Sequence, residues 1–183
     1  MAYDIGINCR DTAGFVTDGA NETYTKALDV YPVTRGGVTF GADENLSSAD
    51  RDAGVDRRLA GIVFRANSAN FRIDLPEAGS AIVHLAFGDQ SSDHANPNQV
   101  DVKDDTTPLF TIGPHAITTA KFWDASDVER TTAAWPGSEV GRSVTFATTI
   151  CRLAFGVPVN FWTLAHVRVV SGAAARRFLL VRR

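Results

Sequence analysis

Apolar and polar residues alternate with a period of two along most of this 183-residue chain. In residues 71–75, apolar side chains flank Arg72 and Asp74, and in residues 81–87 every second residue is apolar on one face. A strand places successive side chains on opposite faces, so this pattern is typical of strands that bury one face. No window of a dozen residues has the apolar spacing of an amphipathic helix. We therefore predict an all-β chain.

Residues that favour turns separate the predicted strands at short intervals. The 15 glycines and 7 prolines supply the backbone angles that tight turns require. The turn from Pro76 to Gly79 joins the two strands described above, which predicts a β-hairpin. Further strands are predicted over residues 3–8, 100–103, 109–112, 117–123, 144–155, 161–169 and 178–181.

Many short strands with turns between them indicate a two-sheet antiparallel jelly-roll sandwich. The chain length fits one domain over residues 1–183, with 171–183 as a terminal strand or an assembly arm. Three polar stretches, 41–57, 88–98 and 124–142, are predicted to be loops. Long loops on a rigid sandwich are where binding residues usually lie.

The charge and the termini restrict the function classes. A net charge of -3 gives no electrostatic reason to expect nucleic acid as a partner. The apolar runs are too short for a membrane span. The first residues lack the basic start and the apolar stretch of a secretory signal, so we expect synthesis in the cytoplasm. Cys9 and Cys151 do not form a disulfide framework and are expected to be buried thiols, although whether they pair stays open.

The sequence contains none of the common catalytic motifs. It has no Gly-x-Ser-x-Gly elbow, no His-Glu-x-x-His helix and no phosphate-binding loop. Pairs of carboxylates such as Asp104 with Asp105 lie in polar stretches, without the apolar burial that separates the two pKa values of a glycosidase. We therefore expect a non-catalytic protein that requires no cofactor. A small polysaccharide-active hydrolase that uses Asp50 and Asp52 is the alternative.

Aromatic residues beside short polar ones point to a ligand. Sugars present apolar C–H faces that stack on aromatic rings, while their hydroxyls pair with carboxylates and amides. Trp123 directly precedes the 124–142 stretch, and Trp135 lies within it. Trp162 lies out of phase with its neighbours, which predicts that it faces a second sheet, another subunit or a ligand. The predicted carbohydrate-binding residues are Trp123, Asp124, Trp135, Tyr24, Asp89 and Asn96. His94 with Asp89 and Asp93 is a candidate metal site or a solvated loop.

Several segments resemble one known family. The run Phe71-Arg72-Ile73-Asp74-Leu75-Pro76, followed by Gly79 and by a strand that ends Phe87-Gly88-Asp89, resembles the galactose-binding-like β-sandwich modules, most closely their malectin-like and carbohydrate-binding members. Tyr3-Asp4-Ile5-Gly6, Val38-Thr39-Phe40-Gly41 and Arg51-Asp52 resemble further segments of these modules. The resemblance implies a carbohydrate-binding type of fold and a structural calcium ion near the first strand, with Asp4, Asp18 and Asp52 as candidate ligands.

The family's known members are exported, usually as parts of larger enzymes, whereas this sequence shows no export signal. Release by lysis would suit a phage particle, so by analogy we expect a decoration, spike or tail protein on a virion. Its partners would be other virion subunits, copies of itself as a homo-oligomer, and a cell-surface glycan. The alternative is a purely structural assembly protein without a sugar ligand. In either case the basic C-terminus is the predicted assembly segment, through Arg176, Arg177, Arg182 and Arg183.

Overall fold

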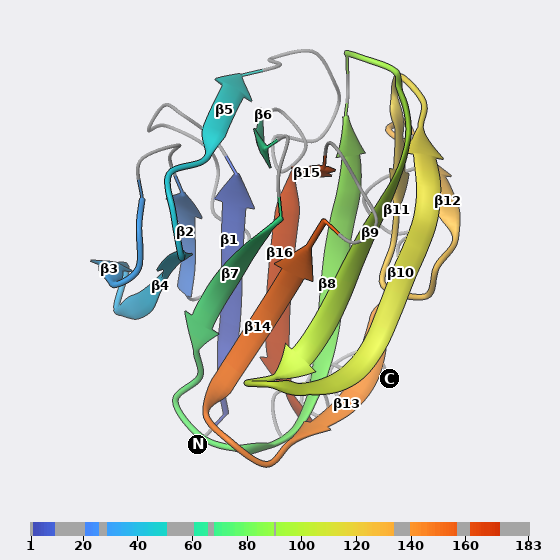
Figure 1. Cartoon of the computed structure of the whole chain (residues 1–183). Coiled ribbons are helices and arrows are strands. Elements are labelled where there is room, and N and C mark those ends of the chain that lie inside the picture. Colours follow the sequence, from blue (N-terminus) through green and yellow to red (C-terminus); the bar gives the residue numbers. More distant parts are fainter. Residues whose placement is uncertain are drawn as a thin grey trace.

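The computed structural model describes residues 2–9, 21–25, 29–50, 61–65, 68–89, 91–133, 140–156 and 162–172. Within these residues nearly all regular structure is β-strand, and no helix is long and apolar enough to cross a membrane (Figure 1). The predicted all-β class is therefore confirmed. Strand 178–181, the basic C-terminal arginines and most of the proposed terminal arm lie outside the described residues.

A seven-stranded sheet forms one layer of the molecule. Its order is β12-β11-β8-β16-β1-β2, and β13 pairs with β8 in addition. All these pairs are antiparallel except β1 with β2, which is parallel. The strands are β1 (Asp4–Cys9), β2 (Asn21–Thr25), β8 (Gly79–Asp89), β11 (Lys121–Trp123), β12 (Glu129–Thr131), β13 (Arg142–Phe146) and β16 (His166–Ser171).

A six-stranded antiparallel sheet forms the second layer, and a small antiparallel sheet completes the described fold (Figure 1). The six-stranded order is β10-β9-β14-β7-β4-β3, and the small sheet has the order β15-β6-β5. The six-stranded sheet contains β3 (Val33–Arg35), β4 (Val38–Ala42), β7 (Ala69–Asp74), β9 (His94–Asp104), β10 (Thr107–Ile117) and β14 (Ile150–Phe155). The small sheet contains β5 (Ser47–Asp50), β6 (Gly61–Arg65) and β15 (Trp162–Leu164).

The inward faces of the two large sheets share one hydrophobic core. Phe40 stacks on Phe71 with ring centroids 6.0 Å apart, and Phe155 stacks on Trp162 at 4.1 Å. Trp162 is 1% exposed, so other parts of this chain cover its side chain, and neither another subunit nor a ligand is needed to do so. A smaller cluster lies on the other face of β8, beneath the small sheet, and contains Ile62, Ala86, Phe122 and Ala165. This arrangement is the predicted β-sandwich with an additional covering sheet.

The predicted hairpin over residues 71–87 is wrong. β7 pairs with β4 and β14 in the six-stranded sheet, whereas β8 pairs with β11, β13 and β16 in the other sheet. The turn that starts at Pro76 therefore carries the chain from one layer to the other. Two consecutive strands with alternating apolar residues can bury their apolar faces in one sheet, or they can lie in the two opposite sheets of a sandwich. Alternation alone does not distinguish the two cases.

The prediction of one strand over residues 144–155 fails in the same way. β13 and β14 belong to different sheets, and residues 147–149 form a turn between them. Buried Asp104 holds that turn because its carboxylate accepts hydrogen bonds from Ala147 N at 2.7 Å, Thr148 N at 3.0 Å and Thr148 Oγ1 at 2.5 Å. The carboxylate that makes the turn stable comes from a distant strand, so the local sequence gives little indication of it.

The three predicted loops also contain strands. β5 lies within residues 41–57, β9 starts within 88–98, and β12 lies within 124–142. Conversely, the strand predicted over 117–123 is interrupted, since β10 ends at Ile117 and β11 starts at Lys121. Cys9 and Cys151 are buried free thiols, and burial, with a smaller effect of Asp104, raises the pKa of Cys151 to about 12.

Candidate functional site

Trp123 lies at the edge where the two large sheets approach each other. Its ring stacks on His115 of β10 with centroids 3.4 Å apart and planes inclined by 9°. His115 Nε2 lies 2.6 Å from Asp127 Oδ1, which fixes the imidazole. Trp123 is partly buried against the main core. One face of its ring is therefore already covered by protein.

Asp124 follows directly and is fully buried. Its Oδ1 accepts hydrogen bonds from Ser126 N at 2.9 Å, Ser126 Oγ at 2.6 Å and Val128 N at 3.2 Å. Its Oδ2 accepts from Arg130 Nε at 2.9 Å and Val140 N at 3.0 Å. Burial by itself raises the pKa of this carboxyl, but the hydrogen bonds outweigh it and hold the pKa below its usual value. Asp124 thus organises a turn inside the protein.

Asp89, at the end of β8, has a similar structural environment. Its side chain is fully buried, and its oxygens contact Ser91 N at 2.9 Å and His94 Nε2 at 3.1 Å. The backbones of Tyr24 and Asn96 lie in β2 and β9, and nothing is described of their side chains. Trp135 lies outside the described residues. The structure does not bring the described members of this predicted set to one open surface.

The calcium prediction finds no cluster among the described residues. No group of three or more metal-ligating side chains occurs in the part of the chain that the structure describes. Asp4 instead forms a two-point ion pair with Arg168, with distances of 2.7 Å and 2.6 Å. A guanidinium at that carboxylate repels a second cation. Asp18 and Asp52 lie outside the described residues, so a calcium ion there stays a prediction.

The two buried turn carboxylates predict a dependence of stability on pH. The pKa of Asp104 is also lowered, since hydrogen bonds from residues 147 and 148 outweigh its burial. A carboxyl with a folded pKa below its unfolded value of about 3.9 stabilises the fold above that value, and this stabilisation is lost as the pH falls through the folded pKa. We expect the free energy of unfolding to decrease less between pH 5 and pH 2 for Asp104→Asn than for the wild type. Urea titrations at several pH values measure this free energy. Identical pH slopes would contradict this assignment.

An open polar groove lies on the outward face of the six-stranded sheet. It has a volume of about 250 Å³ and crosses β7, β14 and β9. Ala154 of β14 is directly opposite Asn70 of β7 on one side and Asp101 of β9 on the other. A small side chain between two longer ones leaves a hollow, because opposed residues are only about 5 Å apart. The groove is lined by Asp43, Ser68, Ala69, Asn70, Gln99, Asp101, Lys103, Ala154 and Phe155.

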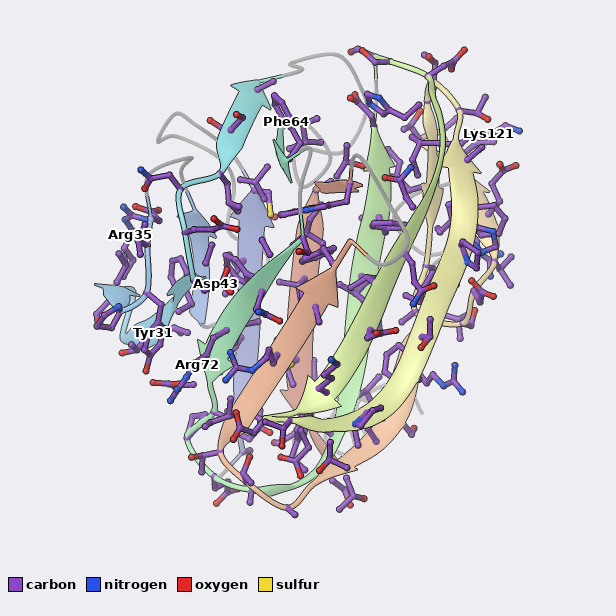
Figure 2. The ribbon with its side chains drawn as sticks, viewed as in Figure 1. Tyr31, Arg35, Asp43, Phe64, Arg72 and Lys121 are labelled. Carbon is purple, nitrogen blue, oxygen red and sulfur yellow. The ribbon has the colours of Figure 1, made fainter. Side chains whose placement is uncertain are left out.

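Hydrogen bonds hold the two walls of the groove. On one wall, Asp43 accepts from Asn70 N at 2.9 Å and from Asn70 Nδ2 at 2.7 Å. On the other wall, Asp101 Oδ1 accepts from Gln99 Nε2 at 3.1 Å and Thr111 Oγ1 at 2.7 Å. Figure 2 shows Asp43 and Arg72 on this side of the molecule, with Tyr31 further along it. The walls are therefore preorganised by contacts among their own side chains.

Several polar atoms of the groove remain available. Among the described residues, no hydrogen bond or ion pair engages Asn70 Oδ1, Gln99 Oε1, Asp101 Oδ2 or Lys103 Nζ. Three acceptors and one cationic donor thus surround a small apolar floor. This combination can bind several hydroxyl groups at once.

This groove could not be predicted from the sequence. Its polar residues occupy the outward positions of strands β7 and β9, where the alternating pattern predicts only a solvated face. Ala154 is the one unusual feature, because it is a small residue between Leu153 and Phe155 in its strand. Its role in forming the hollow becomes visible only from the strand register, which places it between Asn70 and Asp101.

No protein-family model matches this sequence. No curated protein matches it either. Among solved structures, the fold is similar to the ANX2 ectodomain from Arabidopsis thaliana, with 11% identity, a TM-score of 0.51, and coverage of 92% of this chain and 42% of that one. It is also similar to a Bacteroides uniformis beta-glucuronidase, with 9% identity, a TM-score of 0.55, and coverage of 91% and 18%.

A third similar structure is the complex of the plant peptide RALF23 with FER and LLG2, with 12% identity, a TM-score of 0.51, and coverage of 92% and 40%. At these identities the likeness establishes the fold alone. The chain spans less than half the length of each of these three proteins. The comparisons therefore confirm the expected β-sandwich fold.

Proposed function

We propose that this protein is a non-catalytic carbohydrate-binding β-sandwich module whose ligand lies in the groove above Ala154. The observation that supports the proposal most directly is the set of unengaged polar atoms on Asn70, Gln99, Asp101 and Lys103 around that small residue. A sugar ring offers hydroxyls that both donate and accept, so it can satisfy three acceptors and an ammonium donor together. Its C–H face would rest on the Ala154 methyl group.

The groove differs from the aromatic platform that we expected from the sequence. The residues that line it include one aromatic side chain, Phe155, which is 3% exposed and belongs to the core. Binding then depends on hydrogen bonds to hydroxyls, worth about 1 kcal/mol net for the neutral amides and about 1.5–3 kcal/mol for the charged Asp101 and Lys103. A single site of this kind is weak, and several copies on one particle would raise its avidity.

The context of two similar structures is compatible with this proposal. One is named a beta-glucuronidase, and another is a complex of the plant peptide RALF23 with FER and LLG2. The first name associates a fold of this type with an enzyme of sugars. We infer a binding role here, rather than hydrolysis, because the groove is an open hollow on a sheet face and Asp43 is anchored to Asn70 at both oxygens.

Filling the groove tests the proposal. We expect Ala154→Leu to reduce binding to a retained neutral glycan at least tenfold, because the larger side chain occupies the space between Asn70 and Asp101. The ligand is first selected on a glycan array with the wild type, and both affinities are then measured by isothermal titration calorimetry. Ala116→Leu is the matched control, since Ala116 is an exposed residue on β10 outside the groove.

Three results would contradict the proposal. The array could show no retained glycan, Ala154→Leu could bind as tightly as the control, or the retained glycan could be cleaved during incubation with the wild type. The last result would favour the alternative of a polysaccharide hydrolase. In each case the binding measurement is made beside a thermal unfolding curve, so that loss of folding is not mistaken for loss of the ligand.

The proposed setting is the surface of a phage virion, where the module would be present in many copies as a homo-oligomer. The support is the analogy made from the sequence, together with the need of a weak site for multiple copies. Deleting the residues from Ala173 onward tests this setting. If the deleted chain binds glycan normally but is no longer incorporated into particles, the basic C-terminus acts in assembly. Glycan-independent assembly with no sugar binding would favour a purely structural protein.

A further inference from the structure

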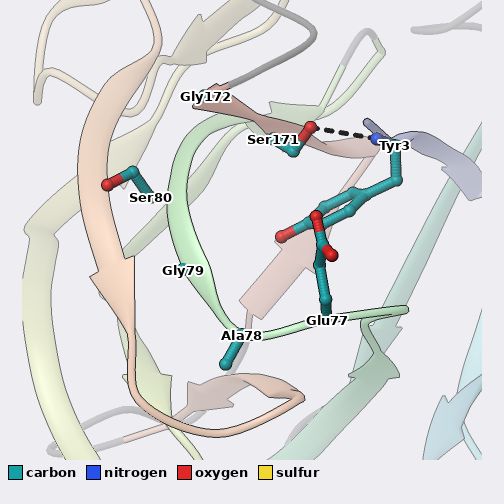
Figure 3. A pocket seen from close by; sticks show the side chains of 7 residues that line it. All are labelled: Tyr3, Glu77, Ala78, Gly79, Ser80, Ser171 and Gly172. Atoms are coloured by element: carbon teal, nitrogen blue, oxygen red, sulfur yellow. Dashed lines mark hydrogen bonds between the residues drawn. The ribbon is translucent and has the colours of Figure 1, made fainter. Parts of the chain in front are cut away.

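A second pocket lies at the end of the sandwich away from the groove described above. It has a volume of about 370 Å³ and is formed where the start of β1, the turn before β8 and the end of β16 meet (Figure 3). The residues that matter for its chemistry are Tyr3, Glu77, Gly79, Ser80 and Ser171. It shares no lining residue with the groove on the six-stranded sheet.

Tyr3 leaves a buried hydroxyl without a partner in this pocket. The residue is 5% exposed, and its Oη has no hydrogen-bond partner among the described residues. Its backbone N donates to Ser171 Oγ at 2.9 Å, which anchors the residue at the pocket wall. Figure 3 shows the phenol pointing into the space beside Glu77 and Gly79. An unsatisfied buried hydroxyl costs the fold roughly 1–3 kcal/mol, so it is a feature that a ligand can relieve.

The charges of the lining residues and the open space in the pocket restrict the class of ligand that it can bind. Glu77 is the one ionisable residue besides Tyr3 among the described lining residues, and no described cation lines the pocket. Burial raises the pKa of Tyr3 to about 12, with smaller effects of Cys151 and Glu77, so the phenol stays protonated and can donate. A Cβ built on Gly79 would have no atom within 4 Å, so the pocket is open at that point.

We propose that this pocket binds a small neutral polyhydroxyl compound, with one hydroxyl that accepts from Tyr3 and donates to Glu77. An anion can accept from the phenol but is repelled by the carboxylate. An ammonium can donate to the carboxylate but leaves the phenol proton without an acceptor. A hydroxyl group meets both requirements. The site is a second one, independent of the proposed function of the groove.

Ligand-observed NMR on the Ala154→Leu protein tests this site while the groove is filled. The probes are glycerol, methyl α-D-glucopyranoside and methyl α-D-galactopyranoside, with ethylammonium and acetate as charged comparisons. We expect at least one neutral probe to bind, and Tyr3→Phe and Glu77→Gln each to weaken it at least fivefold. Tyr31→Phe and Glu44→Gln are the matched controls, because neither residue lines the pocket.

Thermal unfolding gives a second readout. Without ligand, Tyr3→Phe is expected to have a midpoint temperature of unfolding equal to or above that of the wild type, because the hydroxyl that it lacks has no partner among the described residues of the wild type. The neutral probe should raise the midpoint of the wild type but not that of Tyr3→Phe. The proposal is overturned if no neutral probe binds, if ethylammonium or acetate binds more tightly than all three, or if Tyr3→Phe binds like the wild type. None of these results depends on whether the groove binds glycan.

Discussion

Replacing Asp124 with alanine is expected to destabilise the protein by about 3–5 kcal/mol, the usual cost of removing one partner from a buried charged network. The carboxylate accepts five hydrogen bonds, one of them from the Arg130 guanidinium. In the alanine variant these donors, including a cation, lose their acceptor. Urea unfolding followed by circular dichroism measures the change.

Two further variants show whether the loss of stability in Asp124→Ala comes from the buried hydrogen bonds. Asp124→Asn retains the shape of the side chain and one acceptor oxygen, so we expect it to lose less stability than the alanine variant. Glu129→Ala is the control, since its ion pair with Lys121 is exposed and such pairs contribute about 1 kcal/mol or less. If Asp124→Ala were no less stable than Glu129→Ala, the buried network would not have the structural role assigned to it here.

Trp162→Ala is expected to cost about 3–5 kcal/mol as well, for a different reason. The indole is fully buried, stacks on Phe155 and links the small covering sheet to the main core. Its removal leaves a cavity that the rigid sheets cannot fill by collapse. Trp162→Phe preserves an aromatic contact and should lose clearly less stability.

The Trp162 measurement also separates packing from ligand binding. Phe155 lines the groove and is held by Trp162 from the core side. Trp162→Phe should therefore retain glycan binding at conditions where it is folded. If Trp162→Phe unfolded like the wild type but lost its ligand, the packing of Trp162 beneath Phe155 would instead control the shape of the groove. Val128→Ala, at an exposed surface position, serves as the control for truncation alone.

The alternating pattern was sufficient to predict the fold class and the sandwich, but not the pairing of strands. β7 and β8 each have a clear apolar face, and either a hairpin or a connection between sheets would bury it. The choice depends on which distant strands supply the edges, such as β14 for β7 and β16 for β8. These contacts join residues far apart in the sequence, and no local propensity encodes them.

The candidate sites were harder to predict for a related reason. Polar residues in predicted loops, such as Asp89 and Asp124, are buried because backbone amides in the same turns need acceptors. The groove residues looked like an ordinary solvated face until the register placed Ala154 between Asn70 and Asp101. The unpartnered hydroxyl of Tyr3 is likewise invisible without a count of hydrogen bonds.

The most direct test of the central proposal maps the retained glycan onto the backbone by heteronuclear NMR. On titration, we expect the amide signals of Asn70, Asp101 and Ala154 to shift together with one apparent dissociation constant, while those around Trp123 stay in place. The proposal is contradicted if the glycan shifts signals around Trp123 or in the segment around Trp135 and leaves the three groove amides unchanged.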